Sequence, residues 1–370
     1  MSRRLTVVQL LPALESGGVE RSTLEITAAL AAAGHRALVI SEGGRLLPAL
    51  EAAGGEHIDL PVGRKSLAAF ATMRRLRATL AQIQPDIVHA RSRLPAWLAW
   101  QALRGLPAPR PRFVTTVHGL NSPGRYSGIM ARGEQVICVS ETVRAHVLRH
   151  WPATDPARLH VIERGIDPAQ FPRGHQPDAG WRLRFGREFP ELQDGRLLLL
   201  PGRGTRLKGH ADAIRLLANL RNAGEDARLW LLGAREAGRE AYVAELEALA
   251  GELGVRSVLA ISPPRSDIAD AYAMADLVLQ LSNKPEAFGR TVIEALSVGR
   301  PVLGWDSGGV GEQLEALYPL GAVRPGDRAA LAATARALLS APPPMPVTIP
   351  HTLAAMQSAT LELYERLVQT

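Results

Sequence analysis

Two glutamates mark the most informative stretch of the chain, residues 283–305 (NKPEAFGRTVIEALSVGRPVLGW). Glu286 and Glu294 are separated by seven residues. The apolar periodicity of RTVIEALSVG predicts a helix that ends at Gly299 and Pro301. Glu286 therefore falls in the loop before the helix and Glu294 within its opening turns. At a rise of ~1.5 Å per helical residue, plus a more extended loop, we expect the two carboxylates ~10 Å or more apart.

That separation indicates which chemistry the pair can do. Two carboxylates that flank one glycosidic bond in a retaining hydrolase lie ~5 Å apart, so hydrolysis of that kind is disfavoured. Carboxylates also accept paired hydrogen bonds from vicinal hydroxyls, so Glu286 could bind a sugar and Glu294 a ribose at two ends of one ligand. The alternative, a surface glutamate and a helix-face glutamate without a ligand, is stronger for Glu294 than for Glu286.

A second candidate stretch is PGRGTRLKGH (201–210), directly after an apolar run. Arg203 and Lys208 can converge on one diphosphate, the arginine through its planar fork and the lysine as a point charge. A P-loop would need Gly-Lys-Ser/Thr, whereas the chain has Lys208 followed by Gly209 and His210. The dinucleotide fingerprint also fails, because Leu207 stands where its third small residue belongs. We therefore expect side-chain cations to hold the diphosphate.

Two further candidates lie in the first half of the chain. Gly17 and Gly18, within SGGVER (16–21), follow the first apolar run, so their backbone could approach an anion at a helix start. A plain tight turn explains them equally well. His118 follows the run FVTTV. Alone it would be read as a core or loop histidine, but the carboxyl end of a central strand faces the ligand cleft in an open α/β sheet.

Short apolar runs alternate with helical patterns throughout the chain, which predicts an α/β protein with two doubly wound, Rossmann-like domains and a cleft between them. We expect an N-terminal domain (1–172), a linker that can hold one short helix (173–195) and a C-terminal domain (196–345). A helical pattern ends the chain (346–370), and a return to the first domain is one option for it. The predicted strands are 5–11, 36–40, 86–90, 113–117, 135–139 and 159–162, then 196–200, 227–232, 257–261, 277–281 and 301–305.

The net charge of +7 is unevenly distributed. Arginines crowd the first half at positions 64, 74, 75, 77, 91, 93, 104, 110, 112 and 125. This favours an anionic partner, such as a phosphorylated acceptor or acidic lipid, although a solvated basic face is an equal alternative. Nucleic acid is disfavoured because aromatics are only 5% of residues and none interleave with the arginines. The helix predicted over 67–83 packs on a sheet or attaches to anionic lipid.

Compartment and membrane topology are constrained by a few features. The single cysteine, Cys138, excludes an intramolecular disulfide and a cysteine metal cluster and fits a reducing cytoplasm. The opening MSRRLTVVQLLPAL is interpreted as a buried strand, because Gln9 and Pro12 interrupt the apolar run of a signal peptide. No stretch approaches the ~20 apolar residues of a spanning helix. We expect a cytoplasmic protein, with peripheral attachment to the inner face of the cytoplasmic membrane as an option.

Taken in order, these motifs resemble one known family. The Glu286-x7-Glu294 pair around AFGR, the GR and KG of 202–209, SGGVER, PDIVHAR (85–91), VHG (117–119) and SGGVGE (307–312) look like the group-4 glycosyltransferases. These are retaining, metal-independent enzymes of the two-Rossmann GT-B fold. The resemblance covers nearly the whole chain.

Position by position, the resemblance implies a role for each candidate. Glu286 would meet donor-sugar hydroxyls and Glu294 the ribose. The remaining implied contacts are Arg203 and Lys208 with the diphosphate, Gly17 and Gly18 with the leaving phosphate, His118 with the reacting sugar, and the amides of Phe288, Gly289 and Arg290 with phosphate or sugar. One departure is Arg164, where the family usually has asparagine before Gly-Ile-Asp; this puts a hinge contact in doubt.

The expected function is transfer of a sugar, with retention, from a nucleotide diphosphate donor to a glycan or lipid-linked acceptor of a bacterial cell envelope, such as lipopolysaccharide. No cofactor and no catalytic metal is expected, because fixed cations take the metal's place. A same-fold sugar-nucleotide epimerase or phosphorylase is the second enzyme reading. A catalytically silent binding or scaffold protein is the alternative of a different class.

Overall fold

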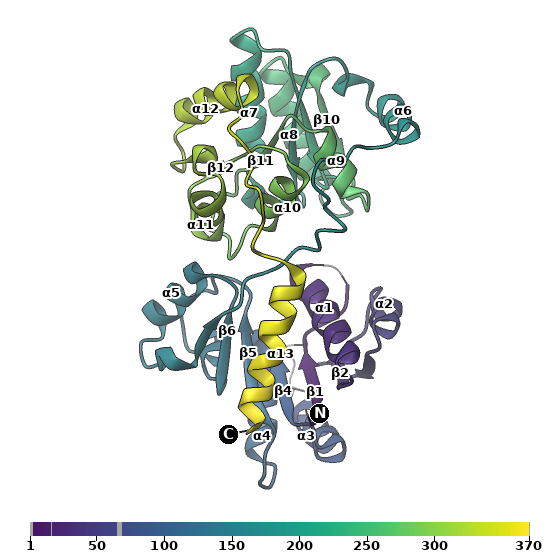
Figure 1. Ribbon diagram of the computed structural model, residues 1–370, viewed down its shortest axis with the longest axis vertical. Helices are drawn as coiled ribbons and strands as arrows, with labels where there is room; N and C mark the ends of the chain where they lie inside the picture. Colours follow the sequence, from purple (N-terminus) through teal and green to yellow (C-terminus); the bar gives the residue numbers. More distant parts are fainter. Residues whose placement is uncertain (1–2, 16, 65–68, 370) are drawn as a thin grey trace. The chain divides into compact units, whose positions relative to one another are not determined.

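The computed structural model describes residues 3–15, 17–64 and 69–369 (Figure 1). They form two compact units. Unit 1 comprises the described residues up to Gly165 and those from Leu353 onward, and unit 2 is Ile166–Thr352. Each unit is a parallel sheet with helices on its faces, so the predicted pair of doubly wound α/β domains is confirmed.

The sheet of unit 1 has the strand order β3-β2-β1-β4-β5-β6-β7, with every described pairing parallel. Its inner strands are almost completely buried because helices cover both faces, which explains their continuous apolar sequences. Its strands are β1 (Thr6–Leu10), β2 (Arg36–Ser41), β3 (Glu56–Asp59), β4 (Ile87–Ala90), β5 (Arg112–Val117), β6 (Gln135–Cys138) and β7 (Leu159–Val161).

The last helix of the chain, α13 (Leu353–Gln369), is part of unit 1 and lies beside its strands in Figure 1. Met356, Leu363 and Tyr364 of this helix join the core formed by residues of β1, α1 and β4. The other helices of unit 1 are α1 (Gly18–Ala32), α2 (Leu47–Ala52), α3 (Ala69–Ile83), α4 (Arg93–Arg104), η1 (Ser127–Ala131), α5 (Glu141–His150) and η2 (Pro156–Arg158). Residues 67 and 68 of the predicted helix 67–83 lie outside the described residues.

The sheet of unit 2 has the order β10-β9-β8-β11-β12-β13, again with parallel pairings. Its strands are β8 (Arg196–Pro201), β9 (Ala227–Leu232), β10 (Leu259–Ser262), β11 (Leu277–Gln280), β12 (Val302–Trp305) and β13 (Ala322–Val323). Its helices are α6 (Ala179–Glu188), η3 (Pro190–Leu192), η4 (Arg206–Lys208), α7 (His210–Asn222), α8 (Glu240–Glu252), η5 (Arg256–Val258), α9 (Ile268–Met274), α10 (Arg290–Val298), α11 (Gly308–Leu317), η6 (Pro319–Gly321) and α12 (Arg328–Ser340).

The segment expected as a linker, 173–195, belongs to unit 2 and carries the helix α6. Asp178 caps this helix by accepting a hydrogen bond from the backbone N–H of Trp181 at 2.7 Å. The rings of Trp181 and Phe185 stack at 5.1 Å, and Phe185 packs on Trp230 of β9 at 5.0 Å. This aromatic packing fixes α6 to the sheet.

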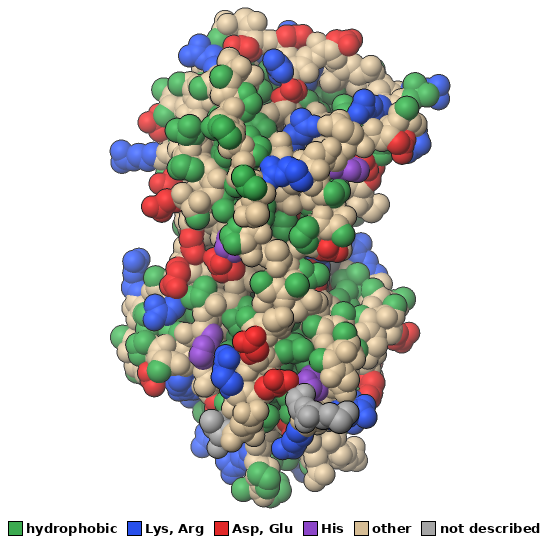
Figure 2. Space-filling model, in the orientation of Figure 1, with side chains coloured by type: hydrophobic (Ala, Val, Ile, Leu, Met, Phe, Trp, Pro, Cys, Tyr) green, Lys and Arg blue, Asp and Glu red, His purple; other side chains and the backbone are tan. Residues whose placement is uncertain are grey.

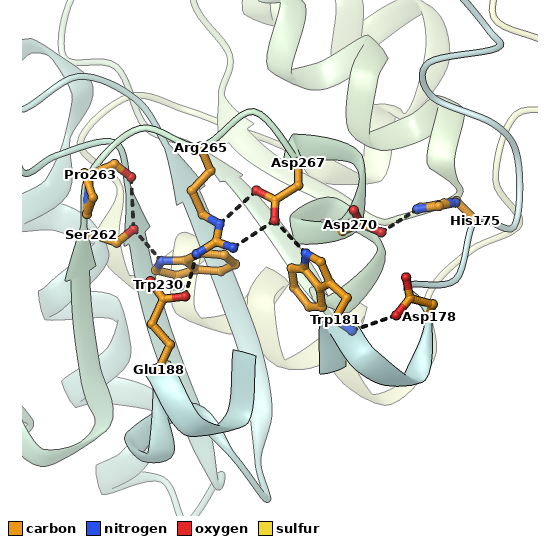
Figure 3. A network of polar contacts seen from close by, with 10 residues as sticks. All are labelled: His175, Asp178, Trp181, Glu188, Trp230, Ser262, Pro263, Arg265, Asp267 and Asp270. Carbon is orange, nitrogen blue, oxygen red and sulfur yellow. Dashed lines mark hydrogen bonds and ion pairs between the residues drawn. The ribbon is translucent and has the colours of Figure 1, made fainter. Parts of the chain in front are cut away.

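An ion-pair network completes the attachment of α6 (Figure 3). Asp267 accepts a hydrogen bond from Trp181 Nε1 at 2.6 Å and pairs with Arg265 at 2.8 Å. Arg265 also pairs with Glu188, the last residue of α6, at 2.8 Å. The Arg265 guanidinium lowers the pKa of Asp267 to about 2, so this carboxylate is ionised at neutral pH.

We predict that Asp267→Asn destabilises the chain by roughly 1–2 kcal/mol at pH 7, because the charged partner of Arg265 and Trp181 is lost. The folded-state pKa is depressed. The contribution is therefore present above the unfolded value of ~3.8 and disappears as the pH falls to about 2. Urea unfolding of wild type and variant at pH 7 and pH 3 measures the difference. Asp226→Asn, at an exposed carboxylate paired with Arg221 and Arg228, is the control and should shift the midpoint less.

Candidate active site

A lysine–glutamate pair lies where unit 2 offers a ligand site. Lys208 follows β8 and Glu286 follows β11, and these two strands are neighbours from which the chain continues toward opposite edges of the sheet. Such a switch point leaves a crevice beyond the carboxyl ends of the strands. Lys208 Nζ lies 2.5 Å from Glu286 Oε1, and both side chains are about one quarter exposed (29% and 24%).

Neighbouring polar groups orient the Glu286 carboxylate. The Ser282 hydroxyl donates to Oε1, the oxygen that also binds Lys208, and Gln280 Nε2 donates to Oε2 at 3.3 Å. Gln280 ends β11, so the rigid sheet sets the position of its amide. A carboxylate held by three donors in this way can present its remaining lone pairs to the hydroxyls of a ligand.

The two loops that carry this pair are joined through their backbones. The N–H of Asn283 donates to the carbonyl of Leu207 at 2.8 Å, and its side-chain amide donates to the carbonyl of Arg206 at 2.9 Å. Gly209 allows the backbones of the two loops to come very close together, because a Cβ built there would lie 1.9 Å from the carbonyl oxygen of Leu281. Its φ of +76° also favours glycine.

The SGGVGE motif supports the Glu286 loop from the other side. Gly308 forms an isolated parallel bridge with Glu286, and the N–H of Gly309 donates to the carbonyl of Glu286 at 2.8 Å. A Cβ at Gly309 would lie 2.5 Å from both the carbonyl oxygen of Ala287 and the Cα of Phe288. These two glycines therefore let the start of α11 pack directly on the backbone of residues 286–288.

Other predicted residues of unit 2 lie in different environments. Arg203 is exposed, and among the described residues its guanidinium forms no hydrogen bond or ion pair with Glu286. Glu294 is buried on α10, where it accepts a hydrogen bond from Tyr272 at 2.9 Å and pairs with Arg290 at 3.2 Å. The two glutamates thus have separate sets of partners. Phe288 is buried, with its ring edge-on to His351.

The start of α10 presents backbone donors beside this loop. Gly289 precedes the helix with a φ of +89°, and the N–H of Val292 donates to the Gly289 carbonyl at 3.0 Å. The first N–H groups of any helix lack a partner one turn back. The backbone N–H groups of Gly289 and Arg290 therefore lie at the positive end of α10. With that of Phe288, they are the amides expected to contact phosphate or sugar.

Unit 1 holds the remaining candidates. His118 directly follows β5, and its Nδ1 accepts a hydrogen bond from the guanidinium of Arg164, the residue that departs from the family pattern. Arg164 is buried and follows β7. The family pattern predicts a hinge contact at this position, whereas the structure places the Arg164 side chain against a predicted site residue.

A second buried arginine lies at the same edge of this sheet. Arg91 follows β4 and donates to Gln9 at 2.8 Å and to Ser22 at 3.1 Å. Ser22 belongs to α1, whose start is formed by Gly17 and Gly18 at the end of the loop after β1. The carboxylate of Glu20 lies against Gly17, since a Cβ there would meet its Oε2 at 2.7 Å. Ser16 of the same motif lies outside the described residues.

Burial keeps the histidines at these sites neutral. Desolvation, reinforced by the charge of Arg164, lowers the pKa of His118 well below its ordinary value. His210, which begins α7 directly after Gly209, has its pKa lowered to about 4 by burial, and its ring contacts Tyr242. In the sequence, His210 excludes a P-loop but gives no sign of this contact.

Several polar residues of the site were not predicted. Gln280, Ser282 and Tyr272 contact the two glutamates, and Arg91 enters the sequence-based prediction only through the basic composition and the PDIVHAR motif, without a role in the site. For Gln280 and Ser282 a signal was present, because Gln280 ends an apolar strand and Ser282 follows it, at the edge where ligands bind. Within the described parts of the chain, no three His, Cys, Asp or Glu side chains gather as metal ligands.

Comparison with known proteins identifies the family. Residues 16–170 match Glycosyltransferase Family 4, and residues 185–349 match Glycosyl transferases group 1. The D-inositol 3-phosphate glycosyltransferase of Xylanimonas cellulosilytica is 30% identical over 331 residues, which are 80% of this chain and 77% of the relative. The chain belongs to glycosyltransferase family 4. A second D-inositol 3-phosphate glycosyltransferase, from Mycobacterium sp. strain JLS, is 29% identical over 70% of this chain and 59% of its own length.

Solved structures support the same fold for this glycosyltransferase. A glycosyltransferase from Rickettsia africae ESF-5 matches with a TM-score of 0.87 and 26% identity over 99% of both chains. HepE from Anabaena, solved with UDP and glucose, matches with a TM-score of 0.74 and 19% identity over 98% of this chain and 100% of its own. The protein is therefore a glycosyltransferase with the GT-B fold.

We predict that Gly209→Ala destabilises this glycosyltransferase by about 2–4 kcal/mol, because the new Cβ clashes with the Leu281 carbonyl and forces the two site loops apart. Gly224→Ala is the matched control: its φ is +86°, but no heavy atom lies within 4 Å of the place where the new methyl group would stand. The control should cost only the ~1–2 kcal/mol of a left-handed backbone. Denaturant midpoints measure both, and equal losses would contradict the close approach.

Proposed function

We propose that this glycosyltransferase moves a sugar from a nucleotide diphosphate donor, with retention of configuration, to a glycan or lipid-linked acceptor. The single observation that carries the proposal is the contact between Lys208 and Glu286 at the switch point of unit 2. A sugar diphosphate needs a cation for its phosphates and a carboxylate for its hydroxyls, and Lys208 and Glu286 place these two groups side by side.

The charges suit the bond that has to break. Departure of a nucleoside diphosphate from the anomeric carbon leaves negative charge on the phosphates and oxocarbenium-like charge on the sugar. In the proposed complex Lys208 binds the diphosphate, and the exposed Arg203 turns onto it. The amides of Gly289 and Arg290 at the start of α10 add backbone donors. Because these charges are fixed before the reaction, they stabilise the departing phosphates without rearrangement.

The two carboxylates are assigned to the other two parts of the donor, the transferred sugar and the ribose. Glu286, oriented by Ser282 and Gln280, accepts hydrogen bonds from hydroxyls of the transferred sugar. Glu294, already fixed by Tyr272 and Arg290, is assigned to the ribose. We propose that the reaction needs no catalytic metal and no cofactor, since side-chain cations and amides can balance the phosphate charge.

Unit 1 supplies the remaining groups in this proposal. Gly17 and Gly18, at the positive end of α1, approach the leaving phosphate, and His118 meets the reacting sugar. The complexes of HepE with UDP and UDP-glucose support a uridine nucleotide as the first donor to test, although the likeness to HepE itself concerns the fold.

The acceptor is proposed to belong to the bacterial cell envelope. The fold neighbour WaaG is described as a glycosyltransferase involved in lipopolysaccharide biosynthesis, with 20% identity to this chain. The relatives named for inositol 3-phosphate make a small phosphorylated polyol the competing acceptor. Residues 87–133 contain seven arginines and no acidic residue, and such a basic segment favours an anionic acceptor of either kind.

A face of unit 1 supports peripheral attachment to an anionic membrane from the cytoplasmic side. We call it the Trp–Arg face; it consists of Trp97, Trp100, Arg104 and Arg132 on α4 and beside η1. Arg132 lies over both indole rings, at 5.9 and 4.9 Å, and Arg104 lies over Trp100 at 4.8 Å. Lys and Arg side chains also recur at the lower end of unit 1 in Figure 2. No helix in the described ranges has the length and apolarity to cross a membrane.

We predict that Lys208→Ala and Glu286→Ala fold normally but lose at least tenfold in kcat/KM for transfer, because each removes a charge-assisted hydrogen bond of ~1.5–3 kcal/mol. Lys284→Ala is the matched control, since Lys284 is exposed in the same loop as Glu286. The measurement is sugar transfer from UDP-, GDP-, ADP- and TDP-sugars, with circular dichroism as the folding check. Wild-type turnover in Lys208→Ala would remove the lysine from the site.

The same variants report on donor binding without an acceptor. A nucleoside diphosphate that binds the native state should raise the melting temperature of the wild type and of Lys284→Ala, but less that of Lys208→Ala. Hydrolysis of the donor without acceptor would exclude a silent scaffold. The anomeric proton coupling of the product shows whether configuration is retained.

For the membrane, we predict that Arg104→Glu with Arg132→Glu weakens binding to vesicles containing phosphatidylglycerol by about tenfold or more, since each arginine near an anionic surface contributes ~1 kcal/mol. Arg324→Glu with Arg336→Glu, at exposed positions of unit 2, makes the same change in net charge and should leave binding unchanged. Sedimentation at low and high salt measures both. No pelleting of the wild type at low salt would contradict attachment.

A further inference from the structure

An arginine lies against the histidine that the proposed function places beside the sugar. Arg164 stands where the family resemblance leads one to expect asparagine. It follows β7, whereas His118 follows β5, and β6 separates these strands in the sheet. The Arg164 side chain crosses that separation, and its Nη2 donates to Nδ1 of His118. Arg164 is only 8% exposed and His118 is half-buried, so water screens the contact little.

The direction of this hydrogen bond determines the protonation of the imidazole. A guanidinium has only donors and stays charged at any pH at which proteins are folded. Nδ1 must therefore carry a lone pair, which excludes the imidazolium and places the single ring proton on Nε2. Nε2 is buried and has no hydrogen-bond partner among the described residues.

We propose that Arg164 is a positioning residue that fixes His118 as the neutral Nε2–H tautomer, so that this imidazole binds a sugar or phosphate oxygen only as a hydrogen-bond donor. The tautomer is a property of unit 1 alone. Its effect on transfer rests on the proposed function.

The groups around His118 agree with this assignment. The charged or titratable groups that act on it are Arg164 from the loop after β7, Arg91 from the loop after β4, and His89 of β4. His89 has both ring nitrogens occupied, by Tyr364 at 2.5 Å and Thr116 at 2.6 Å. The two arginines, like burial, disfavour a second proton, and the pKa of His118 is accordingly lowered.

A consequence for the reaction follows from the fixed tautomer. A general base needs a free lone pair, and a general acid must give up its proton and later recover it. With Nδ1 occupied by a permanent donor, His118 does neither by shuttling a proton. It contributes a directed dipole, and its neutral state does not change across the pH range in which the enzyme would work.

The wild-type protein tests the tautomer directly. In full-length protein labelled with ¹⁵N-histidine, two-bond ¹H–¹⁵N correlation spectra distinguish Nδ1–H, Nε2–H and doubly protonated rings, and His118→Gln assigns the signal. We expect the Nε2–H pattern from pH 8 down to below ~6.5, the ordinary pKa of histidine. An Nδ1–H pattern, or a His118 imidazolium at pH 7, would overturn the proposal whether or not transfer is observed.

Substitution of Arg164 tests its role. Arg164→Met removes the donor and the charge, so we expect mixed tautomers, a raised His118 pKa and an acid limb of the kcat/KM profile shifted up by about one pH unit. Arg164→Lys retains a donor and should restore the wild-type spectrum. Arg158→Met, at an arginine that donates to backbone carbonyls, is the control and should change neither readout. An unchanged tautomer and pKa of His118 in Arg164→Met would refute the role of Arg164. If that variant does not fold, the wild-type spectrum still decides the tautomer.

Discussion

The contact between Lys208 and Glu286 depends on a constraint of parallel sheets. Strands that are adjacent but connected toward opposite edges leave their carboxyl ends uncovered, and the loops that follow meet there. In unit 2 these loops belong to β8 and β11, and backbone hydrogen bonds through Asn283 join them. The opposite charges are thus positioned by the sheet, and glycines at 209 and 309 allow the main chains to approach closely enough.

The sheet of unit 1 is subject to the same constraint, but the side chains that follow its strands carry different charges. Arg91, His118 and Arg164 follow β4, β5 and the edge strand β7. Their neighbours are mainly neutral, such as Gln9 and Ser22. Burial reduces screening by water, so the charge of a buried guanidinium acts strongly on the groups beside it, and Glu25 is a carboxylate that acts on Arg91. At this edge unit 2 pairs Lys208 with Glu286, whereas unit 1 places the buried Arg164 against His118.

Sequence patterns locate most of this arrangement but not its contacts. Continuous apolar runs predict β8 and β9 closely, because strands covered on both faces need such runs. No such run marks β3 (EHID), which is a half-exposed edge strand, or β13, which has two residues. The linker predicted over 173–195 included one short helix, but the prediction did not use Trp181, Phe185 and Phe189, which recur at helical spacing. The pairing of Lys208 with Glu286, or of Arg164 with His118, needs a register between loops that no local pattern contains.

The position of α13 determines when unit 1 can be completed. Its Met356, Leu363 and Tyr364 fill part of the core around β1, yet they follow all of unit 2 in the sequence. Domains usually fold in the order in which the ribosome releases them. Here unit 1 lacks part of its interior until α13 has been released, whereas Ile166–Thr352 is continuous and can fold earlier. Loss of the seventeen residues of α13 would therefore damage the unit whose other residues precede unit 2 in the sequence.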